Sequence, residues 1–583
     1  KLLAQIVEEL GVIRRALGEA QQGRDGYADT GGAWGSMVRG YRSPLTGAVR
    51  GYALYVPEEA RQKRPLPLIV VLHSIFADER YLFQSMEQFK GLGAMVYQGA
   101  SYRQFDWGGI SAAETWAGLD DVLAKYPVDR DRIYLVGTHG GGRGTWQLAL
   151  SRPDRFAAVA PLFSGIDTRP PFPALRLYPQ YFEAAAEAVL PPPFYQRPNK
   201  PVPAEGREKQ GWEMQALGTR AENLAGMPIW SAYGEEEADA TAERLALLER
   251  LGTRNKDVRV HYEPGAAHGI IPMEHKTPEF WRWLLAQRRG ATPTEICYIA
   301  TDLRHNGAWW AKVERMQSPL EPARIEAKWE PARITVKTAA VEAFSLVVAN
   351  LPGALPAVTV IDGQEMAIGP FKNLPAEVSF WRDEKGTWQT HEQPAAWKTG
   401  KRHGLSGPIH DFQFDRFLVV YGTGGTPEQN VALEKLGRQM ADWGLGAVFE
   451  AKADKDVTAE DLKLCHIVAV GTPGNNAILK RAAELGLSIK WVENGVMVGE
   501  NKAEGPGVGA CVIGPNPLAP KRYLVVVTAT DAAGYGVWKQ ETGCDWVLGK
   551  VTQRPDSGSG FVVTGRGWFD GQWQWKRELT IPQ

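Results

Sequence analysis

The fold of this chain is indicated by the stretch Asp131-Arg132-Ile133-Tyr134-Leu135-Val136-Gly137-Thr138-His139-Gly140-Gly141-Gly142-Arg143-Gly144-Thr145-Trp146. An apolar run enters a glycine-rich turn, and the residues from Trp146 to Leu150 then have the composition of a helix. Glycine suits a turn of this kind, because a side chain would collide with the neighbouring backbone. The stretch therefore predicts a buried strand that turns sharply into a helix.

Within the turn, Gly137 and Gly141 flank His139 in the spacing G-x-H-x-G. A nucleophile elbow has the spacing G-x-S-x-G, in which a strained strand-to-helix turn lifts a serine above the sheet. His139 thus stands where the reacting serine belongs. The pattern predicts the elbow of a serine hydrolase with a changed apex residue.

Length, charge and cysteine content exclude several classes of protein. A chain of 583 residues is long enough for about three or four domains. Lys+Arg (66) and Asp+Glu (67) balance, so we expect no nucleic-acid partner, and no apolar run approaches the roughly 18 residues of a membrane span. The four cysteines form no C-x-x-C pair, which argues against a zinc knuckle or redox motif and leaves their pairing open.

Hydrophobic patterns divide the chain into four segments. Residues 1–35 predict an amphipathic helix and a glycine-rich linker, and this helix packs on the body or joins two copies in a homo-oligomer. In residues 36–290 strands alternate with helices, which predicts a doubly wound, mainly parallel sheet. The proline-rich residues 169–203 are expected to form an irregular cap over its carboxyl edge.

The remaining two segments differ in composition from the first half. Short β-branched runs such as 333–337 and 344–348 predict a β-sandwich-like module over residues 291–400. Residues 401–583 predict a second, flavodoxin-like α/β unit with a tryptophan-rich tail. Its glycine-rich turns 422–426 and 471–475 do not match a phosphate-binding signature, so we interpret them as plain strand-to-helix connections.

Residues 50–285 resemble the α/β-hydrolase domain of bacterial esterases of the prolyl-oligopeptidase-like and polyhydroxybutyrate-depolymerase-like group. The segments that carry the resemblance are 52–57, 67–73, 131–137, 144–146 and 153–161, and the later units resemble long members of the group at 407–411 and 515–517. The resemblance implies an α/β-hydrolase fold and cleavage of a small ester or peptide-like substrate through an acyl-enzyme, without cofactor or metal. It also implies a periplasmic or secreted location.

The resemblance further implies the other site residues, because nucleophile, acid and histidine follow in that order along such chains. The histidine position matches His268. Residue counting gives Glu237 as the acid, with Asp239 as the alternative, although a solvated acidic loop is an equally good interpretation. The backbone N–H groups of Gly140 and Ser74 would form the oxyanion hole.

A second departure from the group's pattern follows His73. Relatives have His-Gly there, whereas this chain has Ser74, Ile75 and Phe76, which places a bulky pair near the expected acyl pocket. Ser74 and Ser164 lie near the site in the matched fold, but neither sits in an elbow motif, so a substitute serine nucleophile is not expected.

Three hypotheses follow for His139. In the first, which two departures at one site favour, catalysis is lost and the protein is a pseudoenzyme, a polymer-binding protein or a structural subunit. In the second, His139 acts as nucleophile or base with His268, and Arg143 beside the helix N-terminus suits an anionic substrate. In the third, His139, His268 and Glu237 bind zinc, which their spacing does not independently support.

Overall fold

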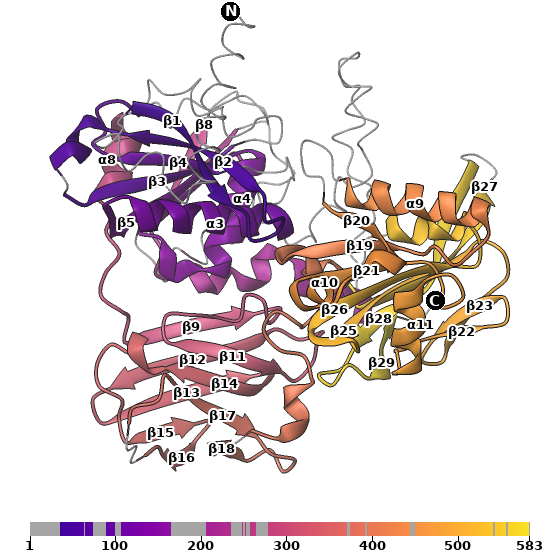
Figure 1. Cartoon of the computed structure of the whole chain (residues 1–583). Helices are drawn as coiled ribbons and strands as arrows, with labels where there is room; N and C mark the ends of the chain where they lie inside the picture. Colours follow the sequence, from indigo (N-terminus) through magenta and orange to yellow (C-terminus); the bar gives the residue numbers. More distant parts are fainter. Residues whose placement is uncertain are drawn as a thin grey trace, which may run out of the picture.

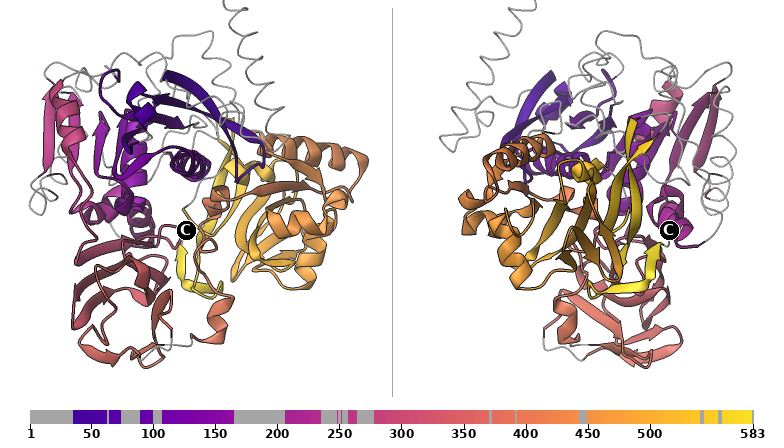
Figure 2. Two further views of the ribbon diagram at one scale, coloured as in Figure 1. Left: turned by 60° about the vertical axis from the view of Figure 1, so that its left-hand side comes forward. Right: turned by 90° about the vertical axis from the view of Figure 1, so that its right-hand side faces the viewer.

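The structure is a computed structural model. It describes residues 35–62, 64–73, 89–99, 107–164, 206–234, 248, 251, 257–263, 278–369, 373–390, 393–442, 449–539, 543–554 and 558–581. The described residues form three units, which we call the N-terminal unit (35–286), the middle unit (295–398) and the C-terminal unit (401–581). The N-terminal unit is stacked on the middle unit, and the C-terminal unit lies beside both (Figures 1 and 2).

The N-terminal unit is built on one eight-stranded sheet of order β1-β2-β4-β3-β5-β6-β7-β8. β2 pairs antiparallel with β1 and β4, and the strands from β4 to β8 are parallel. The strands are β1 (Gly35–Arg42), β2 (Val49–Val56), β3 (Leu66–Leu72), β4 (Met95–Gly99), β5 (Val128–Thr138), β6 (Ala158–Leu162), β7 (Ile229–Gly234) and β8 (Val258–Glu263). The helices are α3 (Gly109–Lys125), α4 (Gly140–Ser151), α6 (Gly206–Gln215) and α8 (Pro278–Ala286).

Both faces of this sheet are buried. Successive residues of a strand point to opposite faces, and along β3 Leu68 and Val70 belong to one hydrophobic cluster while Ile69 belongs to another. The first cluster also contains residues of α3 and α4, and the second contains Phe280 and Trp281 of α8. The helices therefore cover the sheet on both sides, as the alternation of strands and helices in the sequence predicts.

The middle unit consists of two five-stranded sheets, of order β10-β11-β14-β17-β18 and β16-β15-β13-β12-β9. One hydrophobic core is shared by residues of both sheets, with Phe344 and Phe380 stacked at 5.0 Å inside it. The strands are β9 (Glu295–Ala300), β10 (Gly307–Ala308), β11 (Ala311–Met316), β12 (Ala323–Glu330), β13 (Arg333–Ala339), β14 (Val341–Val347), β15 (Val358–Ile361), β16 (Gln364–Ala367), β17 (Glu377–Arg382) and β18 (Trp388–Thr390). This is the arrangement of a β-sandwich.

The C-terminal unit has an eight-stranded sheet of order β20-β19-β21-β26-β25-β27-β28-β29 and a small sheet of β22, β23 and β24. Its strands are β19 (Phe417–Tyr421), β20 (Ala451–Ala453), β21 (His466–Val470), β22 (Ile489–Val492), β23 (Gly495–Val498), β24 (Asn501–Glu504), β25 (Val508–Asn516), β26 (Ala519–Ala529), β27 (Trp546–Arg554), β28 (Gly558–Phe569) and β29 (Trp575–Ile581). Its helices are α9 (Pro427–Ala441), α10 (Ala459–Leu464) and α11 (Ala477–Glu484).

Only half of the large C-terminal sheet has the flavodoxin-like pattern. β20, β19, β21 and β26 are parallel and follow the order 2-1-3-4 of such sheets. From β26 onward the pairs are antiparallel. The expected flavodoxin-like unit with a tryptophan-rich tail is therefore a mixed sheet, in which the tryptophan-rich C-terminal residues form β28 and β29.

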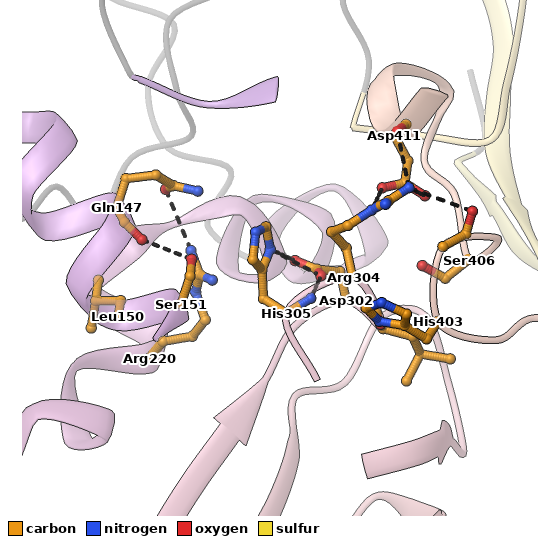
Figure 3. A network of polar contacts seen from close by, with 12 residues as sticks. Gln147, Leu150, Ser151, Arg220, Asp302, Arg304, His305, His403, Ser406 and Asp411 are labelled. Carbon is orange, nitrogen blue, oxygen red and sulfur yellow. Dashed lines mark hydrogen bonds and ion pairs between the residues drawn. The ribbon is translucent and has the colours of Figure 1, made fainter. Parts of the chain in front are cut away.

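Polar side chains connect the three units. Asn223 of the short 3-10 helix η7 (Leu217–Leu224) exchanges hydrogen bonds with the backbone of Ile299 in β9. Arg304 of the middle unit donates to Asp411 of the C-terminal unit, with Nε 3.0 Å from Oδ1. Figure 3 shows Arg304 and Asp411, with Gln147, Ser151 and Arg220 of the N-terminal unit at the left of the view.

Several expectations concern residues outside the described part. They are the N-terminal amphipathic helix over residues 1–20, the linker after it, and the cap over 169–203. All four cysteines are described; Cys297 is partly buried, and Cys465, Cys511 and Cys544 are buried. Among the described residues, no helix is long and apolar enough to cross a membrane.

Candidate active site

The apex of the turn after β5 is His139. Its backbone has φ 59° and ψ −118°, and it is the N-cap residue of α4. A positive φ is rare for a residue that carries a Cβ, and such strain concentrates at functional sites. The strand, the strained apex and the following helix together form a nucleophile elbow.

Three glycines make this turn sterically possible. A Cβ at position 137 would lie 2.1 Å from the carbonyl oxygen of Gly141, and one at position 141 would lie 1.9 Å from that of Leu72. A Cβ at Gly142 would lie 2.7 Å from the carbonyl oxygen of Leu162. Because these neighbours are backbone atoms, the glycines of the G-x-H-x-G pattern are required by the fold even though the serine is absent.

Backbone hydrogen bonds hold the apex in place. The His139 N–H donates to the carbonyl oxygen of Leu162 at 3.0 Å, and the His139 carbonyl accepts from the Arg143 N–H at 3.1 Å. His139 is partly exposed. The elbow therefore presents an imidazole at the carboxyl edge of the parallel strands, where ligands of open α/β sheets bind.

Gly140 and Arg143 lie in the first turn of α4. Gly140 is the first residue of the helix, so its N–H has no acceptor within the helix and suits the oxyanion role that the sequence predicts. Arg143 is 9% exposed. Its charge is thus near the elbow, but its side chain is mostly inside the protein rather than on the surface.

Trp107 is a neighbour of the elbow that sequence reasoning missed. Its indole lies 5.0 Å from the ring of His73, at the end of β3, in an edge-to-face arrangement. A Cβ at Gly144 would lie 2.4 Å from Trp107 Cγ, so the indole is also against the backbone of α4. Both Trp107 and His73 are buried. The only local signal is the Gly108-Gly109 pair after the tryptophan, which is too common to single it out.

The other predicted site residues lie outside the described part of the chain. They are His268, Glu237 and its alternative Asp239, Ser74, and the bulky pair Ile75 and Phe76. Their predicted roles stay predictions. Among the described residues, no group of three or more potential metal ligands occurs. Two of the three ligands in the zinc hypothesis, His268 and Glu237, are not among the described residues.

Ser164 follows β6 and is 8% exposed. A Cβ added at Gly142 would lie 2.7 Å from the Ser164 Cβ. The Ser164 carbonyl oxygen accepts a hydrogen bond from Trp146 Nε1 at 3.2 Å. The residue thus packs against α4 near the elbow without occupying its apex.

The glycine-rich turns of the C-terminal unit contact each other. The Gly424 N–H donates to the Asn475 carbonyl oxygen at 2.9 Å. The Asp454 carboxylate accepts from the Thr423 hydroxyl at 2.5 Å and from the Ala477 N–H, at the start of α11, at 2.7 Å. Because an internal carboxylate occupies the N-terminus of α11, these turns are connections, and we assign them no ligand.

Several tryptophans in the described part of the chain are inside the protein. Trp107, Trp146, Trp310 and Trp546 are among the largest fully buried residues. The burial of these four indicates that they pack in the core.

Three solved structures illustrate what the chain is similar to, each at low sequence identity. No protein-family model and no curated protein matches the chain. A thermostable esterase has 18% sequence identity and a TM-score of 0.30, covering 44% of this chain and 63% of its own, so less than two thirds of that protein is spanned. The S-formylglutathione hydrolase FrmB from Staphylococcus aureus has 15% identity and a TM-score of 0.31, covering 43% of this chain and 96% of its own. The acylaminoacyl peptidase from Pyrococcus horikoshii has 16% identity and a TM-score of 0.31, covering 44% and 42%.

The α/β-hydrolase fold of the N-terminal unit follows from its own geometry. Its sheet is mainly parallel with an antiparallel edge, helices cover both faces, and a strained elbow follows a central strand. The middle and C-terminal units are additional, strand-rich parts of the chain.

Proposed function

We propose that this protein is a homologue of serine hydrolases that keeps the elbow backbone but has lost the acyl-serine step. It binds a small ester- or peptide-like ligand and does not turn it over by the serine route. The observation that supports this proposal is the elbow itself, in which Gly137 and Gly141 keep the required space and His139 occupies the apex. Without an apex hydroxyl no acyl-serine forms there, and loss of the nucleophile removes nearly all of the rate.

The start of α4 supports ligand binding without turnover. The Gly140 N–H is directed out of the first helical turn, and the positive end of the helix dipole favours a carbonyl or carboxylate oxygen beside it. The partly exposed His139 side chain lies at the same helix end and offers a further polar group.

Restoring the serine tests the proposal. We expect wild type and His139→Ala to hydrolyse short p-nitrophenyl esters equally slowly, whereas His139→Ser gains turnover with a burst of acyl-enzyme formation. In the serine background, His268→Ala should remove the gain. If His139→Ser stays inactive, more than the nucleophile has been lost, and the proposal of an otherwise intact site is wrong.

A second candidate function is favoured by the strain at His139. A non-glycine residue at φ 59° costs about 1–3 kcal/mol, whereas glycine adopts this conformation readily. A side chain kept at that cost can be one that is used, as nucleophile or base together with His268. Ester turnover by wild type that is lost in His139→Ala would favour this candidate over the first.

The zinc hypothesis has a separate test. His139, His268 and Glu237 would form a two-histidine, one-carboxylate ligand set. Metal analysis of purified wild type should then find stoichiometric zinc, and His139→Ala should lose it. Absence of zinc from a preparation made with zinc in the medium would contradict this hypothesis.

A further inference from the structure

Ile110, in the first turn of α3, packs in the core of the C-terminal unit. Ile110 is fully buried and belongs to the same hydrophobic cluster as Ile409 and Phe412. These two residues are in the 3-10 helix η11 (Ile409–Phe414). In the opposite direction, Phe414 packs against the core of the N-terminal unit. The two units therefore share side chains at this helix end instead of meeting at a flat surface.

Gln413 brings η11 against the backbone at the start of α3. The side chain is buried, and a Cβ at Gly109 would lie 2.9 Å from its Oε1 and 3.4 Å from its Cβ. Gly109 has φ +48°, a conformation that glycine adopts readily. The C-terminal unit thus packs closely on the residue where α3 begins.

Two residues before Gly109 is Trp107, the indole that packs against the elbow. Trp107 itself has a positive φ of 52° and is 1% exposed. Its indole contacts the backbone of α4 at Gly144 and the ring of His73. Gln413 thus packs against Gly109, the chain runs from Gly109 back to Trp107, and Trp107 packs against α4 and His73 beside the elbow.

We propose that the C-terminal unit positions the His139 elbow of the N-terminal unit, with Gln413 and Ile110 as positioning residues that act through Trp107. The proposal rests on the proposed function only in taking the His139 elbow as the ligand site. Reacting or binding groups must be held to within about 0.5 Å, and supporting residues provide that precision. The second half of the chain is then part of the site's support rather than an independent module.

The position of His73 can be measured directly by NMR of the full-length protein with histidine labelled at Cε1. The Trp107 ring changes the chemical shift of the His73 signal, because the two rings are in contact. His73→Gln assigns this signal, because the signal is lost in that variant. Trp107→Phe shows how far the chemical shift changes when the indole is replaced. We expect Gln413→Ala and the milder Ile110→Val to move this signal in the same direction as Trp107→Phe. Leu479→Ala, in α11 and in the same hydrophobic cluster as Ile110, is the matched control and should leave it in place.

A His73 signal that is unchanged in both Gln413→Ala and Ile110→Val, with the fold intact by circular dichroism, would overturn the proposal. So would an equal displacement in Leu479→Ala, because the effect would then report general loosening of the C-terminal core. Ile110→Val removes a single methylene group, so it keeps the test decisive if Gln413→Ala does not fold.

An activity measurement adds a second readout in the His139→Ser background. Gln413→Ala should lower kcat by about tenfold and leave KM nearly unchanged, because misplacing a reacting group affects the chemical step. If His139→Ser has no activity, the proposed function fails, whereas the NMR result still decides whether the C-terminal unit positions the elbow.

Discussion

The carbonyl oxygen of Leu72 lies where a side chain at Gly141 would begin, since a Cβ at position 141 would be 1.9 Å from that oxygen. Leu72 ends β3 and Gly141 is the second residue of α4, so the elbow helix starts directly against a neighbouring strand. The oxygen belongs to the backbone and the position of a Cβ is fixed by the backbone, so no side-chain rotation can relieve the contact. The sharpness of the elbow is thus fixed by packing within the sheet, whichever residue occupies its apex.

We predict that Gly141→Ala destabilises the N-terminal unit by at least about 1–3 kcal/mol, the usual cost of an added methyl group in a tightly packed site. The midpoint of urea unfolding measures this change. Gly226→Ala is the matched control in the same unit, because a Cβ there meets nothing within 4 Å. Equal midpoints for the two variants would show that the elbow can shift and that the close contact is not a constraint.

We predict that His139→Gly is more stable than His139→Ala by about 1 kcal/mol or more, because glycine relieves a backbone strain of about 1–3 kcal/mol. Both variants remove the imidazole, so their difference isolates the Cβ and its backbone cost. Calorimetric or urea unfolding of the pair measures it. If His139→Ala is the more stable variant, the apex backbone is not strained in solution. Strain then gives no reason to infer that the His139 side chain is used.

The elbow was predictable from the sequence because its signals are local. An apolar run, glycines at fixed spacing and a following helix are all contained between Ile133 and Leu150, and the strand and helix form there as β5 and α4. The predicted roles of His268, Glu237 and Ser74 depend instead on residues that are far apart along the sequence. Residue counting alone cannot place such residues, so these roles stay predictions.

The second half of the C-terminal sheet was not predictable for a different reason. Its strands contain glycines that strand propensities count against, such as Gly549 in β27, where a Cβ would lie 2.5 Å from the Val562 carbonyl oxygen of β28. The glycine is there because the neighbouring strand approaches closely. Likewise the contact between Arg304 and Asp411 joins residues 107 positions apart, and no local pattern reports it.

We predict that Arg304→Met destabilises the protein by about 3–5 kcal/mol, because it leaves the buried Asp411 carboxylate without its cation. Arg304 is 3.0 Å from Asp411 and 2.7 Å from Asp415, and its side chain is only 12% exposed. Urea unfolding measures the loss, and Arg438→Met, which removes an exposed ion pair on α9, should give no measurable change. Adding Asp411→Asn to Arg304→Met should recover part of the loss. A double variant that is less stable than the single one would show that the buried charge on Asp411 is not the cause.

We predict that His466 makes the protein less stable in mild acid. Burial lowers the pKa of His466 and outweighs the Asp415 carboxylate, which favours the charged form, while the Arg304 cation lowers the pKa further. Because the folded state then binds a proton less readily than the unfolded state, the stabilising contribution is complete above the unfolded pKa of about 6.5. It is lost as the pH falls from there toward the lower pKa of the folded protein.

The Nδ1 atom of His466 accepts from the Tyr523 N–H at 2.9 Å, which already requires an unprotonated ring nitrogen. Urea midpoints measured from pH 8 to pH 5 should therefore fall more steeply for wild type than for His466→Gln, which has no proton to take up in this range. Parallel curves would mean that His466 is charged in the folded protein as readily as in the unfolded chain.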